Sequence, residues 1–226
     1  MSRALPLLLL ACHGSEPPLT PDDTAAASAD LTHPITMPGT PTLDPRSART
    51  SDVCVACHPA QVAAWSTSNH AYAMVDPVYQ ALVRLRQQHR DGLEDRFCTQ
   101  CHSAIGVRGG EIGPGFAFED LSEPVLEGVT CVSCHAITEV FQDFNAGHHL
   151  DLDGPMHGPL AVHDAPPVHD VAQSDLFRQP VLCGSCHDVI EINGLDLERP
   201  YQEWLESPAA AEGVGCADCH MPAYDG

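Results

Sequence analysis

The chain has 226 residues, of which 43% are hydrophobic and 5% aromatic, and its formal net charge is −21. This length permits one or two domains. The negative charge excludes nucleic acid as a partner, because two polyanions repel each other. The 17 glycines and 20 prolines punctuate the chain, and no long apolar run has a period of two or 3.6 residues. Something other than side chains must therefore fill much of the interior.

The N-terminus has the pattern of an export signal. A basic start precedes the apolar stretch from Leu7 to Leu10, which is followed by Ala11 and Cys12. The stretch is too short for a transmembrane helix, which needs roughly 20 apolar residues. Its end, Leu-Leu-Ala-Cys12, resembles a bacterial lipobox, and this resemblance implies cleavage before Cys12 and lipidation of its thiol. The alternatives are an ordinary export signal and a translation start upstream of this methionine.

The segment that follows is rich in Pro, Thr, Ser and Ala, with scattered Asp. Such a composition buries too little apolar surface to order itself. We therefore expect a signal peptide at residues 1–11 and a disordered tether at residues 12–50. His13, in place of Asp after the lipobox cysteine, resembles outer-membrane sorting.

Ten of the eleven cysteines form five Cys-x-x-Cys pairs, and a histidine follows every pair. We number these motifs along the chain: motif 1 (Cys54, Cys57, His58), motif 2 (Cys98, Cys101, His102), motif 3 (Cys131, Cys134, His135), motif 4 (Cys183, Cys186, His187) and motif 5 (Cys216, Cys219, His220). Two thiols at this spacing reach the two vinyl groups on one haem edge, and the next imidazole turns toward the iron.

Zinc is the main alternative for Cys-x-x-Cys pairs. Zinc knuckles usually combine two per metal, whereas five is an odd number, and zinc does not explain a histidine after every pair. The pattern therefore predicts five covalently bound haem c groups, each with a motif histidine as the proximal iron ligand.

Local structure is expected to be short helices joined by loops. Asp76 and Pro77 resemble an N-cap and a first helical position, and the segment to Gly92 carries an apolar stripe that should face inward: Val78, Leu82, Leu85 and His89. A shorter helix should run from Pro59 towards Trp65. Residues 104–130 and 143–170 read as loops because they are rich in Gly, Pro and Asp. The predicted fold class is mainly α with extensive irregular loops, with the haems forming the core.

Histidines outside the motifs supply candidates for the second axial ligand of each iron. Two imidazoles suit a low-potential haem that shuttles electrons. The favoured distal ligands are His70, His149 and His169, and His89 is a weaker candidate because an inward histidine is often only packed. For the other three histidines of the region, simple packing is as good an explanation: His148, His157 and His163.

The chain from Cys54 to Pro222 resembles the multihaem cytochrome c family that includes the tetrahaem electron acceptor of hydroxylamine oxidoreductase. Four segments carry the resemblance: Cys-Val-Ala-Cys-His58 followed by Trp65 and Ser68-Asn-His70-Ala; Gly128-Val-Thr-Cys-Val-Ser-Cys-His135; Leu182-Cys-Gly-Ser-Cys-His187-Asp; and Gly215-Cys-Ala-Asp-Cys-His220-Met-Pro. The present chain has five motifs rather than four and ends soon after the last one. Residues 51–226 are therefore expected to be a pentahaem domain, either truncated at its C-terminus or with its fifth haem at a bare end.

The expected function is electron transfer through five haems in the cell envelope. A body of about 175 residues has a radius of gyration of about 16 Å, so five haems must lie close together. The acidic surface suits a redox partner with a basic docking face. The lipobox implies a lipid anchor on the periplasmic side, at the outer membrane.

Two alternatives remain at this point. The first is a reductase or oxidase that acts on a small molecule at one five-coordinate haem. Pentahaem nitrite reductases usually mark that haem with Cys-x-x-Cys-Lys, which does not occur here, so an electron carrier without catalytic residues is favoured. The second is a docking subunit that connects the partners of a larger redox complex.

Overall fold

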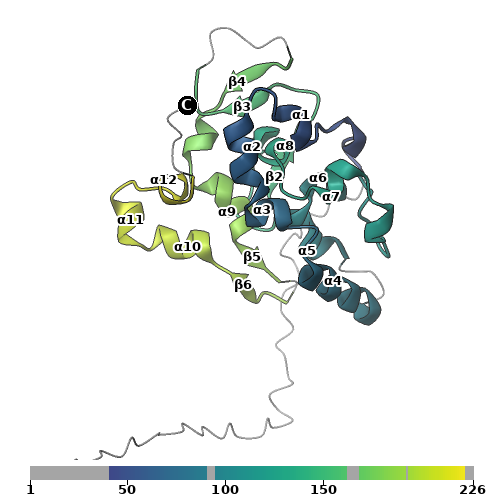
Figure 1. The fold of residues 1–226 in the computed structure, drawn as a ribbon. Coiled ribbons are helices and arrows are strands. Elements are labelled where there is room, and N and C mark those ends of the chain that lie inside the picture. Colours follow the sequence, from purple (N-terminus) through teal and green to yellow (C-terminus); the bar gives the residue numbers. More distant parts are fainter. Residues whose placement is uncertain (1–40, 91–94, 162–167, 192, 222–226) are drawn as a thin grey trace, which may run out of the picture.

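The computed structural model describes residues 41–90, 95–161, 168–191 and 193–221. Short helices joined by irregular segments make up most of this part of the chain (Figure 1). The helices are α1 (Ser51–Cys54), α2 (Pro59–Ser66), α3 (Asn69–Tyr72), α4 (Pro77–Arg90), α5 (Asp95–His102), α6 (Ala104–Arg108), α7 (Glu123–Leu126), α8 (Cys131–His135), α9 (Val181–His187), α10 (Pro200–Leu205), α11 (Pro208–Ala211) and α12 (Cys216–His220), with 3₁₀ turns at Pro45–Ser47, Phe118–Asp120 and Asp175–Arg178. The predicted fold class, mainly α with irregular loops, is confirmed.

Three small two-stranded sheets connect the helices. Strands β1 (Ile137–Val140) and β2 (His148–Leu150) form an antiparallel hairpin directly after α8. Strands β3 (Met156–Gly158) and β4 (Val171–Gln173) pair in parallel, and β5 (Val189–Ile190) and β6 (Asp196–Glu198) pair antiparallel after α9. Sheets of two strands have little stability of their own, so these pairs depend on what they pack against.

The buried apolar side chains form two small clusters. The larger one gathers residues from the turn before α4, from α4, α6 and α7, and from the segment between α6 and α7: Met74, Tyr79, Val83, Val107, Ile112, Phe118, Leu121 and Val125. The smaller one contains Ala48, Ile105, Val132 and Ala136. No hydrophobic side chain is buried among the described residues from 168 to 221, although motifs 4 and 5 lie there. This part of the chain therefore lacks an apolar core made of its own side chains.

Helix α4 docks through a different face from the one that its sequence suggests. Val78, Leu82 and Leu85 are 65%, 56% and 48% exposed, and His89 is exposed as well, whereas Tyr79 and Val83 are buried. The expectation that the Val78–His89 stripe points inward is therefore wrong. Periodicity identifies an apolar stripe, but docking follows the aromatic ring of Tyr79, which lies about 100° around the helix from Val78.

Two expected boundaries also change. Residues 41–50, assigned to the tether, pack on the domain: Pro45 and Ala48 are buried, and the Thr42 amide donates to the Arg108 carbonyl at 2.9 Å. Residues 104–130, expected to be a loop, contain α6 and α7. The glycines of this segment suggest helix breaks, but Gly106 and Gly109 instead allow close contact with neighbouring side chains. The expected helix after Pro59 is confirmed as α2. The signal peptide, Cys12 and His163 lie outside the described residues.

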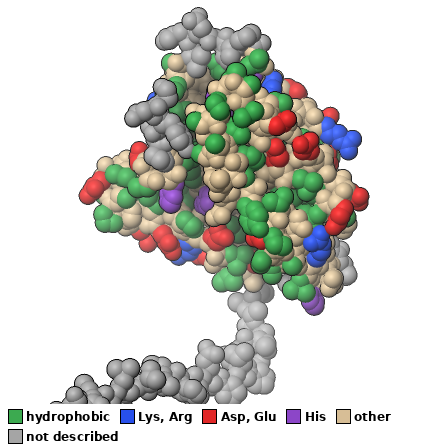
Figure 2. Space-filling view, in the orientation of Figure 1, with side chains coloured by type: hydrophobic (Ala, Val, Ile, Leu, Met, Phe, Trp, Pro, Cys, Tyr) green, Lys and Arg blue, Asp and Glu red, His purple; other side chains and the backbone are tan. Residues whose placement is uncertain are grey.

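Apolar side chains interrupt the acidic surface on the face in Figure 2, and histidine side chains reach that surface near the C-terminal helices. Within the described ranges, no helix is both long enough and apolar enough to span a bilayer.

Candidate haem-attachment sites

Each of the five motifs contains a helical turn. Motif 2 ends α5 and motif 4 ends α9, whereas motifs 3 and 5 are the short helices α8 and α12 themselves. Motif 1 starts at the end of α1, and the His58 amide donates to the Cys54 carbonyl at 2.9 Å. Residues three apart lie on the same side of such a turn, so both thiols of a motif face the same way. None of the ten motif cysteines forms a disulfide bond.

Side chains before motifs 1 and 3 hold their helices in place. Both carboxylate oxygens of Glu127 accept from the Ser51 amide, at 3.1 and 3.0 Å, and so cap α1. Thr130 and Ser133 form a capping box at α8, in which the Thr130 hydroxyl accepts from the Ser133 amide at 3.2 Å. Because Glu127 lies only four residues before Cys131, it connects the starts of motifs 1 and 3.

Contacts between thiols connect all five motifs. The thiols of Cys54 and Cys131, of Cys101 and Cys186, and of Cys183 and Cys216 lie close enough to shift one another's pKa. Motif 1 therefore lies beside motif 3, and motif 4 lies beside both motif 2 and motif 5. Cys134 of motif 3 lies within electrostatic range of Cys186 and Cys183, and burial raises the pKa of Cys134 to about 12. The five motifs thus form one connected group with motif 4 at its centre.

Two proximal histidines have a fixed tautomer. His102 Nδ1 lies 2.8 Å from the Ala73 carbonyl, and His135 Nδ1 lies 2.5 Å from the His157 carbonyl. A carbonyl only accepts, so Nδ1 carries the proton in both rings and Nε2 keeps its lone pair. Burial lowers the pKa of His135, which favours the neutral ring. This is the form in which histidine binds a metal.

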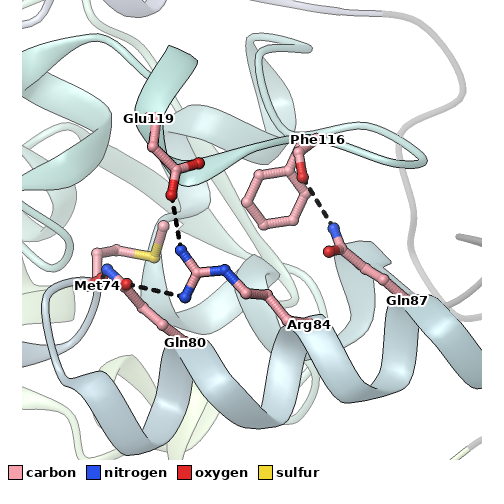
Figure 3. A network of polar contacts seen from close by, with 6 residues as sticks. All are labelled: Met74, Gln80, Arg84, Gln87, Phe116 and Glu119. Carbon is pink, nitrogen blue, oxygen red and sulfur yellow. Dashed lines mark hydrogen bonds and ion pairs between the residues drawn. The ribbon is translucent and has the colours of Figure 1, made fainter.

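Tyr79 packs flat against the His102 ring, with ring centroids 3.9 Å apart and planes 3° apart. Tyr79 is 9% exposed, and burial raises its pKa. Its position depends on α4, which is fastened to residues 116–119 by the contacts in Figure 3: Arg84 to Glu119 at 2.9 Å, and the Gln87 amide to the Phe116 carbonyl at 2.9 Å. Helix α4 therefore acts as a brace for the proximal side of motif 2.

His70 and His187 are neighbours, with ring centroids 6.0 Å apart and ring planes inclined by 50°. Two imidazoles on opposite sides of one metal ion have ring centres about 6 Å apart, because each metal–nitrogen bond is about 2 Å. Desolvation lowers the pKa of His70, and the neighbouring His187 lowers it further, so the ring stays neutral. The structure brings together the proximal histidine of motif 4 and one predicted distal ligand.

The other predicted distal ligands are placed less favourably. His149 is exposed and lies against Phe141, with ring centroids 4.6 Å apart. His169 is half-buried and close enough to His135 to affect its pKa, but its Nδ1 contacts the carbonyl of its own neighbour, Asp170, at 3.0 Å. His89 is exposed on α4.

Sequence reasoning gave too little weight to His148. This side chain is 1% exposed, and its Nε2 is buried without a hydrogen-bond partner among the described residues. Neighbours in a strand point to opposite faces, so burying one histidine of the His148–His149 pair exposes the other. The sequence favours His149 of this pair as the ligand, but sequence alone does not show which of the two rings lies inward.

These features fit a haem at each motif. Thiols in pairs face one way, histidine nitrogens are held as lone-pair donors, and the polar atoms Tyr79 Oη and His148 Nε2 are buried without partners in the described chain. In these ranges, no group of three or more His, Cys, Asp or Glu side chains is arranged to hold a metal ion.

Comparisons with known proteins agree with this arrangement. Residues 53–136 match the family described as cytochrome c554 and c-prime. Cytochrome c-554 of Nitrosomonas europaea is 32% identical over 88 residues, which cover 36% of this chain and 35% of that protein. The crystal structure of a penta-heme cytochrome c552 from Thermochromatium tepidum matches with a TM-score of 0.63 and 21% identity, over 81% of this chain and 56% of that one. The chain thus spans about a third of the curated relative and just over half of the solved structure.

Proposed function

Because this chain has the fold of a multihaem c-type cytochrome, we propose that it transfers electrons through five covalently bound haem c groups. When bound, haem supplies a one-electron redox couple at its iron. The chain supplies the ten thioether sulfurs of motifs 1 to 5 and five proximal imidazoles. His70 is the distal ligand paired with His187, and His169 and His149 remain weaker candidates after it.

The connected thiols are the observation that carries the proposal. Each motif cysteine would hold the vinyl edge of its own cofactor, so motifs whose sulfurs lie close together would hold their cofactors close together as well. The neighbouring thiols Cys54 and Cys131, Cys101 and Cys186, and Cys183 and Cys216, together with Cys134 near Cys186, leave no motif isolated. A protein that stored or sensed separate haems has no need of such continuity.

The surface suits a basic redox partner. The chain contains no lysine, so all ten of its basic side chains are arginine, against 31 acidic residues. Arg46, Arg84 and Arg199 each lie beside a carboxylate, which leaves the surface field strongly negative. Association with a cationic partner should weaken as salt rises, because screening shortens the range of attraction.

We also place the protein on the periplasmic side of the envelope, anchored at the outer membrane through lipid on Cys12. The N-terminal sequence supports this placement. A Cys12→Ser variant should move from the membrane fraction to the soluble periplasm. The resemblance to the family of the tetrahaem electron acceptor of hydroxylamine oxidoreductase points to an enzyme of that kind as the electron donor. This choice of donor stays a prediction.

The decisive experiment counts haems and tests their irons. Haem-stained gels and intact mass should show five haems on purified protein. Electron paramagnetic resonance of the oxidised protein should then show low-spin signals that are unchanged by nitrite or hydroxylamine. A high-spin signal that shifts with either compound would instead favour the alternative, a reductase or oxidase with one open iron.

A further inference from the structure

His148 is held in one tautomer by a side chain of motif 4. Its Nδ1 lies 3.1 Å from the Ser185 hydroxyl, and Ser185 is fully buried. That hydroxyl has a single proton, for which the Leu182 carbonyl at 2.8 Å is a nearer and stronger acceptor than the Cys186 sulfur at 3.9 Å. Ser185 therefore accepts from His148, so Nδ1 carries the proton and Nε2 carries the lone pair.

The buried Nε2 lone pair of His148 has no hydrogen-bond partner among the described residues, so a ligand atom is expected there. Burying an imidazole nitrogen without a hydrogen bond costs free energy, and such orphan atoms are rare in folded proteins. His102 and His135 show the same pattern, in which Nδ1 is fixed and Nε2 is left for iron. Metal-bound histidines commonly donate their other N–H to a fixed acceptor, which raises the basicity of the ligand.

The iron that His148 serves is not the iron of motif 4. The ring centroids of His70 and His187 lie 6.0 Å apart, so these two imidazoles would together hold the iron of motif 4. His148 lies instead beside the sulfur of Cys186, which contacts Cys101 of motif 2. The ring therefore lies between motif 4 and its neighbours.

We propose that His148 Nε2 is the distal iron ligand of a haem attached at a motif next to motif 4, and that Ser185 is the positioning residue for this ligand. The inference rests on the proposed function and deepens it. Ser185, a residue of motif 4, would then set the midpoint potential of a haem attached at a neighbouring motif.

The backbone around His148 is built to hold this geometry. Asn145 and Ala146 adopt left-handed φ angles of 49° and 56°, which non-glycine residues rarely do. The Ala146 amide donates to the Ser185 carbonyl at 2.6 Å, and the Asn145 amide donates to the Asp188 carbonyl at 3.0 Å. Arg108 also donates to the Ala146 carbonyl, at 2.5 Å. These bonds clamp the turn before β2 onto motif 4, and strain that persists at such a turn marks a constrained site.

The first test replaces Ser185 with Ala in the haem-loaded protein. All five haems should remain, while one midpoint potential rises and one low-spin signal shifts its g values, because the ligand loses basicity. Ser133→Ala is the matched control, since Ser133 holds the same position in motif 3 but caps its own helix. The control should lose stability without moving any potential. Unchanged potentials and g values in Ser185→Ala would overturn the role of Ser185.

The second test removes the ligand. His148→Gly should convert one haem from low spin to high spin with all five haems attached, and added imidazole should restore the low-spin signal. His149→Gly tests the other ring of the pair, and loss of the low-spin signal in that variant instead of in His148→Gly would overturn the inference. A wild-type spectrum in His148→Gly would overturn the inference while five-haem electron transfer stands, whereas a wild-type protein without covalent haem would remove the proposed function itself.

Discussion

Gly184 lies inside haem-attachment motif 4 and also forms the contact between helices α9 and α10. A Cβ at this position would lie 2.5 Å from the Tyr201 ring, so glycine lets α10 pack directly on α9. The corresponding positions of the other motifs carry Val55, Thr99, Val132 and Ala217, which shows that haem attachment itself tolerates a side chain there.

Gly184→Ala should therefore destabilise the protein by about 1–3 kcal/mol through overpacking against Tyr201, without loss of haem. Guanidinium unfolding of the holoprotein measures this change. A second variant, Gly184→Ala combined with Tyr201→Ala, should show less than the sum of the two single effects, because the clash is gone. Strict additivity would show that the ring does not cause the penalty.

Tyr79 offers a test of the brace on motif 2. Tyr79→Ala removes the ring that stacks on His102 and should cost about 3–5 kcal/mol, as expected for a large core side chain. Tyr79→Phe keeps the stack and removes a buried hydroxyl that has no partner in the described chain, so it should be neutral or stabilising by about 1 kcal/mol. Thermal unfolding of both variants checks this. A clear loss of stability in Tyr79→Phe would mean that the hydroxyl is hydrogen-bonded in the holoprotein.

At the scale of elements, the chain uses one arrangement twice. The only two tryptophans each donate from Nε1 to a carbonyl two residues before a motif cysteine: Trp65 to Val129 at 2.7 Å, and Trp204 to Val214 at 2.8 Å. A serine three residues after each tryptophan caps the next helix, and a glycine with φ near 75° precedes each valine. Helices α2 and α10 are thereby tied to motifs 3 and 5.

Replacing either tryptophan with Phe keeps most of the ring but leaves the valine carbonyl unpaired, which should cost about 1–3 kcal/mol. Trp204→Phe should loosen motif 5 locally, whereas Trp65→Phe should loosen motif 3. Amide exchange of the residues that precede each motif separates the two. Equal exchange at both motifs in either variant contradicts a local tie.

The two copies of this arrangement also show what sequence could and could not predict. The repeated motif spacing predicts the attachment residues, and it does so from sequence alone because the signal is local. The sequence also predicts His70 as a distal ligand, and it lies beside His187. The inward face of α4 and the choice between His148 and His149 depend on which side of a short element meets the rest of the chain. The sequence assigns Ser185 no role, because its contact with His148 joins positions far apart in sequence.

The molecule as a whole is organised around motif 4. Its Cys186 contacts motif 2, its Cys183 contacts motif 5, and its helix carries the buried Ser185 that holds His148. Motif 5 lies at the periphery, where Cys219 and His220 are exposed and Met221 is 71% exposed. The part of the chain that bears both motifs buries no apolar side chain among its described residues from 168 to 221, so the cofactors must supply the stability that side chains do not.

This asymmetry predicts different outcomes when one haem is prevented from attaching. Cys216→Ser with Cys219→Ser should give a folded protein with four haems, because no other described motif depends on motif 5. Cys183→Ser with Cys186→Ser should lower the yield of folded protein sharply and reduce attachment at more than one motif, since motif 4 supports motif 2 and the His148 turn. Haem stoichiometry by intact mass, together with circular dichroism, compares the two. If both double variants retain four haems and the same melting temperature, the motifs fold independently and motif 4 is not their centre.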